Sequence, residues 1–150
     1  MSRSPRADLP LVLTVAATVS VLAATMLPWL RSGSVVRNAY ALARSAAILG
    51  VIDGWPRRLC LALLYALPLL VAATWTAGAL RRRATTALLG GIVGATSIAA
   101  GAIVTERVTA DLGPILAIAT GAVAVSCAVW LAMSGTPTNV VTRGANDERA

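Results

Sequence analysis

The chain has 150 residues, of which 57% are hydrophobic, and its mean hydropathy of +0.77 exceeds that of an ordinary soluble domain. This composition predicts one membrane domain and leaves no room for a second. All thirteen basic residues are arginine and the net charge is +7, but the arginines cluster at the ends of apolar runs. That arrangement indicates membrane topology and contact with membrane lipids, and no nucleic-acid partner is expected.

The first apolar run, Leu9–Leu30, has 22 residues without a charge and follows Arg3 and Arg6. At 1.5 Å per residue it reaches roughly 33 Å, enough to cross a hydrocarbon core of about 30 Å. A secretory signal is the alternative, but the run is longer than a typical signal core and no Ala-x-Ala site precedes Trp29. We therefore expect a retained first transmembrane helix.

The connection over residues 31–58 contains a predicted amphipathic helix, Val35–Leu49, with Ser34 as its N-cap and Gly50 as its C-terminal stop. Such a helix could lie in the headgroup plane or pack across the end of the bundle, and the pattern fits both. Its polar face would carry Ser34, Arg37, Asn38, Ala41, Arg44 and Ser45.

After a predicted turn at Asp53-Gly54, an interfacial anchor at residues 55–58 leads into the second span, Leu59–Leu80. Pro68 near its middle predicts a kink. Three arginines then separate this span from the third, Ala84–Thr105, and predict a tight hairpin between the two helices. The third span carries small residues that predict close helix packing, against this chain or another: Gly90, Gly94, Ser97 and Gly101.

The fourth span, Leu112–Met133, follows a short polar loop that we expect to be a solvated turn. Residues 134–150 are polar and lack periodicity, which predicts a disordered cytoplasmic tail. The expected fold is all-α: a polytopic membrane domain over residues 1–133 with four transmembrane helices, plus an amphipathic interfacial helix in the first loop.

Orientation is predicted from the arginines. With both termini in the cytoplasm, seven arginines lie inside and six outside, and the triple arginine is a strong retention signal. We therefore expect a multi-pass plasma-membrane protein with cytoplasmic termini. The tryptophans are expected to form two belts at headgroup depth, Trp29 and Trp55 outside, Trp75 and Trp130 inside.

No predicted span contains an ionisable Asp, Glu, His or Lys, which argues against a proton-coupled exporter. Catalytic motifs are missing too, so we expect no enzyme, no cofactor and no metal. Cys60 and Cys127 would differ in depth by about 20 Å, which makes a disulfide between them unfavourable. The first-loop arginines could contact an anion, a lipid or an acidic protein, or could serve topology alone: Arg31, Arg37, Arg44, Arg57 and Arg58.

The stretch Pro28–Tyr40, with a tryptophan, then Arg-Ser-Gly, then a spaced arginine, resembles the first loop of small four-helix membrane proteins of actinobacteria, of the mycobacterial type. The resemblance covers roughly residues 9–105. It implies the fold and a taxon, and it carries no activity or catalytic residue to transfer.

Two functions are consistent with these patterns. The first is a non-enzymatic accessory or scaffold subunit of a cell-envelope complex, with another membrane protein or a second copy as its partner. The alternative is a carrier or flippase for an anionic lipid or small solute, which would use the first-loop arginines and the kink at Pro68.

Overall fold

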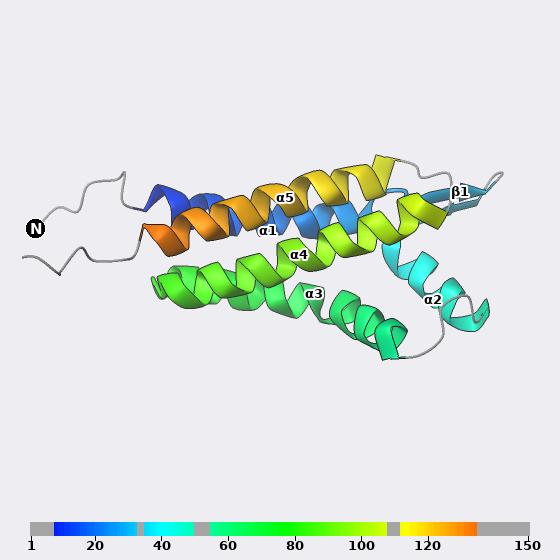
Figure 1. Ribbon diagram of the computed structural model, residues 1–150, viewed down its shortest axis with the longest axis horizontal. Coiled ribbons are helices and arrows are strands. Elements are labelled where there is room, and N and C mark those ends of the chain that lie inside the picture. The colour runs from blue at the N-terminus through cyan, green and yellow to red at the C-terminus, as the bar shows by residue number, and fades with distance from the viewer. Residues whose placement is uncertain (1–7, 33–34, 50–54, 108–111, 135–150) are drawn as a thin grey trace, which may run out of the picture.

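The computed structural model describes residues 8–32, 35–49, 55–107 and 112–134 (Figure 1). Its four long helices are α1 (Leu9–Met26), α3 (Trp55–Ala79), α4 (Arg83–Arg107) and α5 (Leu112–Met133). Each is long and apolar enough to cross a membrane, so the predicted all-α fold with four helices able to span is confirmed. A short helix, α2 (Ala39–Leu49), and a two-stranded hairpin complete the chain.

Helix α4 contacts all three of the other long helices. It lies beside α5 along the length of the bundle and has α3 on its other side, while α1 packs mainly against α5 (Figure 1). The core sits between all four long helices, and α3 contributes Leu67 and Val71 to it. Its most buried large side chains include Val21 from α1, Val93 from α4 and Leu131 from α5.

The bundle has two different ends (Figure 1). The start of α1, the end of α5 and the turn between α3 and α4 lie at one end, which we call the arginine end. The hairpin and α2 lie at the other. Toward that second end α3 runs away from α1, and α2 begins in the space between them (Figure 1).

Pro68 lies near the middle of α3. Because proline has no amide hydrogen, the carbonyl of Leu64 loses its helical donor there and the helix can bend. The half of α3 that precedes Pro68 is the half that diverges from α1 (Figure 1).

Two helix boundaries differ from the predicted spans by four residues, while the end of α3 and both ends of α4 differ by one or two. Helix α1 ends at Met26 and not at Leu30, because Leu27 already has an extended backbone before Pro28. Helix α3 begins four residues early, at Trp55, since a proline in the first turn of a helix costs no hydrogen bond. The predicted interfacial anchor is thus the first turn of α3. The turn predicted at Asp53-Gly54 and the tail beyond residue 134 lie outside the described residues.

The end of α3 is closed by a Schellman motif. The N–H of Arg82 donates to the carbonyl of Ala77 at 2.9 Å, and the N–H of Arg81 donates to that of Gly78, also at 2.9 Å. Arg81 takes the left-handed position, with φ 54°, that glycine usually occupies. The tight turn predicted from three arginines is therefore built with an arginine at its most strained position.

Asp8 connects this turn to the start of α1. Its carboxylate lies 3.5 Å from the guanidinium of Arg81 and 3.6 Å from that of Arg83. All three side chains are at least one-third exposed, so each pair contributes well under 1 kcal/mol, by the usual order of magnitude for exposed ion pairs. The contact orients the turn against α1 more than it stabilises the bundle.

Candidate functional site

The small residues predicted to pack helices lie inside the bundle. A Cβ atom on Gly94 would come within 2.6 Å of the Gly121 carbonyl oxygen, and one on Gly121 within 2.7 Å of the Gly94 carbonyl oxygen. The two glycines therefore let the backbones of α4 and α5 touch. We call this contact the glycine seam.

The other three predicted packing residues extend the glycine seam. Gly90 faces Thr14 of α1 and Ala128 of α5, and Gly101 faces Ile118 and the backbone of Pro114. Ser97 donates its hydroxyl hydrogen to the carbonyl of Ala117 across the helix pair, at 2.8 Å. The sequence did not decide whether the helix packed against these small residues belongs to the same chain or to another. In the structure it belongs to the same chain.

The opposite end of the molecule is closed by a structure that we call the cap. It consists of Trp29, the hairpin of β1 (Leu30–Ser32) with β2 (Val35–Arg37), and α2. The strands are antiparallel, with Leu30 paired to Arg37. Together these elements cover the ends of α1, α4 and α5 (Figure 1).

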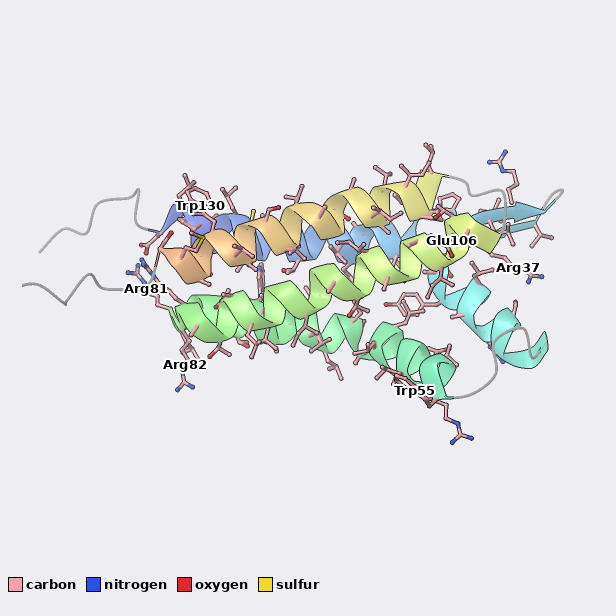
Figure 2. All side chains as sticks on the ribbon, in the orientation of Figure 1. Arg37, Trp55, Arg81, Arg82, Glu106 and Trp130 are labelled. Atoms are coloured by element: carbon pink, nitrogen blue, oxygen red, sulfur yellow. The ribbon has the colours of Figure 1, made fainter. Side chains whose placement is uncertain are left out.

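Trp29 is the centre of the cap and is only 2% exposed. Its indole N–H donates to the carbonyl of Ala24 at 2.9 Å, and its backbone N–H donates to that of Arg37 at 2.8 Å. The expectation that Trp29 stands in an outer aromatic belt is therefore wrong, because the chain reverses after α1 and folds the indole over the helix end. Trp55, at 74% exposed, lies on the outside of α3 (Figure 2).

Gly113 makes room for this tryptophan at the start of α5. A Cβ at Gly113 would overlap the indole ring of Trp29 and the carbonyl oxygen of Pro28. The N–H of Gly113 donates to that same carbonyl at 2.9 Å. The end of α1 and the beginning of α5 are thereby held together through the cap.

Helix α2 starts later than the sequence predicts. Val35–Arg37 forms strand β2, and the helix begins at Ala39, where the side-chain oxygen of Asn38 accepts a hydrogen bond from the N–H of Ala41 at 2.9 Å. Two consecutive β-branched valines favour the strand, and Asn is a strong N-cap residue. The predicted N-cap, Ser34, and the predicted stop, Gly50, lie outside the described residues.

The first turn of α2 fills the space between α1 and α3. Ala39 is buried in one cluster with Ala24 and Leu64, and Tyr40 packs against that cluster. The ring of Tyr40 lies 6.1 Å from that of Tyr65 on α3. The Tyr40 hydroxyl is buried and has no hydrogen-bond partner among the described residues. A buried hydroxyl without a hydrogen-bond partner is energetically unfavourable, so the Tyr40 hydroxyl lowers the stability of the cap.

The first-loop arginines are spread over four elements. Arg31, on β1, and Arg44, on α2, are exposed, as is Arg58 on α3. Arg37 is half-buried and donates to the Ser45 hydroxyl at 2.7 Å, which links β2 to α2. In Figure 2 its side chain points away from the long helices. The side chains of Arg57 and of Cys60 lie outside the described part of the chain.

The three arginines that lie on the cap itself, Arg31, Arg37 and Arg44, are called its basic rim, and Arg58 lies outside the cap on α3. An acidic residue at this end is Glu106, exposed near the end of α4 (Figure 2). Within the described ranges, no three His, Cys, Asp or Glu side chains gather closely enough to hold a metal ion. The cap can therefore offer exposed guanidinium groups and apolar surface to a partner.

Comparison with known proteins gave no match: no family model, no curated protein and no solved structure corresponds to this chain. Function has to be argued from the geometry of the cap and of the bundle.

Proposed function

We propose that this chain is a non-enzymatic accessory or scaffold subunit of a cell-envelope membrane complex, and that it binds its partner through the cap. The observation that carries the proposal is the exposure of β2, on which Val35 and Val36 are each about half exposed, one on each face of the hairpin because successive strand side chains alternate. They are held on a hairpin that is anchored to a buried tryptophan, so the surface is preorganised.

Charge around the valines supports a protein partner. Arg31 lies opposite Val36 in the hairpin register, and Arg44 is exposed on the adjacent helix. An apolar centre with an arginine rim is typical of protein interfaces, in which arginine is enriched. A partner with an acidic and partly apolar surface could bind both the valines and the arginines of the cap.

The glycine seam supports this choice of surface. Its small residues are consumed by packing within the chain, so a partner has to use another face. We further propose that α2 lies in the headgroup plane with Arg44 outward, that the membrane is the plasma membrane, and that the arginine end faces the cytoplasm.

The test is purification from the native membrane through a C-terminal tag in mild detergent. We expect a complex of defined mass, and we expect Val35→Ser combined with Val36→Ser to lower recovery of the partner at least tenfold. The matched control is Val123→Ser with Val129→Ser, two valines equally exposed on α5 but away from the cap. Recovery of the chain alone, or equal recovery from both double variants, would contradict the proposal.

The buried hydroxyl of Tyr40 favours a second candidate, a carrier or flippase for an anionic lipid or small solute. Helix α2 fills the space between α1 and the bent part of α3, and a polar group without a partner stands in it. Displacement of α2 would open that space to the membrane and expose the hydroxyl.

This alternative is tested by transport in vesicles. Arg37→Gln together with Arg44→Gln should abolish movement of a fluorescent anionic lipid between leaflets. Equal rates with and without the wild-type protein would exclude a flippase.

A further inference from the structure

A shallow apolar groove runs between α4 and α5 on the outer face of the bundle. On α4 it begins beside Arg83 and extends to Ala95, and half of its lining residues are small, including Ala84, Gly91, Ala128 and Ala132. A Cβ added to Gly91 would meet its nearest atom only at 4.0 Å. The groove is therefore open at Gly91, unlike the glycine seam.

The length of the groove matches one leaflet of a bilayer. From Arg83 to Ala95 the helix advances twelve residues, or about 18 Å at 1.5 Å per residue, against about 15 Å for half of the hydrocarbon core. Trp130, half exposed near the end of α5 and on the arginine end of the molecule, is placed at headgroup depth (Figure 2). One end of the groove thus lies at the headgroups and the other near the bilayer centre.

The headgroup end of this groove is cationic. Arg81, Arg82 and Arg83 occupy the turn, and Asp8 is the acidic side chain that the described residues place against them. Among the described residues of this turn and Asp8, three guanidinium groups and one carboxylate carry a net charge of +2. The Arg82 side chain points away from that of Arg81, so the positive charge is spread over the end of the bundle (Figure 2).

We propose that this groove binds an anionic phospholipid of the leaflet at the arginine end. The phosphate contacts Arg83 and its neighbours, and one acyl chain lies on the small residues between α4 and α5. The shape supplies a track for a chain of one-leaflet length, and the charge at one end selects a negative headgroup. This site lies at the opposite end from the cap and is independent of the proposed partner surface.

Charge also distinguishes a lipid from a second copy of this chain. A parallel copy seated in the groove would bring its own arginine turn next to Arg83, and like charges repel. An antiparallel copy would bring the basic rim of the cap instead, with Arg31 and Arg44 exposed there. An anionic lipid neutralises part of the positive charge at the arginine turn. Either arrangement of a second copy would add positive charge there.

The test is a titration of the purified protein with phosphatidylglycerol, followed by native mass spectrometry, and a parallel titration with phosphatidylcholine of the same acyl chains. We expect preferential binding of phosphatidylglycerol that weakens with salt. Arg83→Gln should lower this affinity about fivefold, the effect of one basic residue near an anionic surface. Ala95→Leu, which fills the groove, should lower the binding of both lipids.

Matched controls lie on the same elements. Ala99→Leu adds the same side chain on an exposed position of α4 beyond the groove, and Arg58→Gln removes a charge at the other end. Neither should change lipid affinity. Asp8→Asn should raise affinity for phosphatidylglycerol about fivefold, because it removes the competing carboxylate. This gain is informative even where Arg83→Gln disturbs the turn.

Three results would overturn the proposal. The first is equal affinity for the two lipids, and the second is an equal effect of Ala95→Leu and Ala99→Leu. The third is a lipid-independent dimer that Ala95→Leu abolishes, which would assign the groove to a second copy of the chain.

Discussion

Helix pairs on the two sides of this bundle are joined by different means. Between α4 and α5 the backbones touch through Gly94 and Gly121, with no side chain between them. Between α1 and the divergent half of α3, the space is filled by side chains from the cap, with Ala39 and Tyr40 among them. The contact between α4 and α5 requires residues without a side chain. The contact between α1 and α3 requires the side chains of the cap that fill the space.

This contrast teaches where the chain tolerates change. A backbone contact cannot adjust to an added carbon, because neither main chain can move without disturbing its helix. A junction made of side chains can repack around a lost or altered group. Substitutions that add atoms should therefore harm the glycine seam most, and substitutions that remove atoms should harm the cap.

The largest effect is expected at the glycine seam. Gly94→Leu would place a side chain against the Gly121 carbonyl oxygen and Val125, so we expect loss of the folded bundle in a thermal unfolding measurement in detergent. Gly94→Ala should cost about 1–3 kcal/mol. These variants report on folding of the chain itself, because Gly94 faces its own α5. Gly91→Ala, which meets open space, is the control and should unfold no earlier than the wild type.

Removing atoms from the cap comes next. Trp29→Ala should destabilise the protein by about 3–5 kcal/mol, the usual cost of truncating a buried aromatic residue. Trp29→Phe keeps much of the packing and removes the hydrogen bond to Ala24, so it should cost about 1 kcal/mol for the bond and little more. Trp55→Ala, on an exposed residue, is the control for both. A loss of stability as large in Trp55→Ala would refute the central place of Trp29.

A gain of stability is expected at Tyr40. Tyr40→Phe removes a buried hydroxyl without a partner among the described residues, and should raise stability by about 1 kcal/mol. Tyr65→Phe changes an exposed phenol on the neighbouring ring and should have little effect. A loss of stability in Tyr40→Phe would mean that the hydroxyl does have a hydrogen-bond partner. A bound ligand, as in the carrier alternative, would be such a partner.

The smallest effect is expected for the hydrogen bond that crosses the glycine seam. Ser97→Ala removes the donor to the Ala117 carbonyl and should cost about 0.6 kcal/mol, the average for such bonds between membrane helices. A larger loss would show that the glycine seam relies on this bond as well as on close contact. Thr96→Ala, whose hydroxyl bonds within its own helix, provides the comparison.

The spanning helices could be predicted because a long uncharged run has few structures available in a membrane. The spaced small residues of α4 likewise predicted packing, though the partner helix stayed open. The burial of Trp29 could not be predicted, since a tryptophan at the end of an apolar run is equally typical of an interfacial belt. Its position depends on Gly113, more than eighty residues away in the sequence.

The hairpin in the cap had a local signal that the helical periodicity obscured. Two valines after a Ser-Gly-Ser cluster are typical of a strand after a turn, and Asn38 is a better N-cap than Ser34 for a helix that starts at Ala39. The pairing of Asp8 with the arginine turn had no such signal, because the two segments meet only once four helices are packed.

The packing of α1 against α5 affects the order in which the bundle assembles during synthesis. Helix α1 packs mainly against α5, and the ribosome produces α5 after the other three long helices. While α2, α3 and α4 are being synthesised, the face of α1 that later meets α5 has only lipid or an insertion factor to contact. Bundle closure is therefore a late, post-insertion event, and a chain that stops before Leu112 leaves both Trp29 and Gly94 without the surface that completes them.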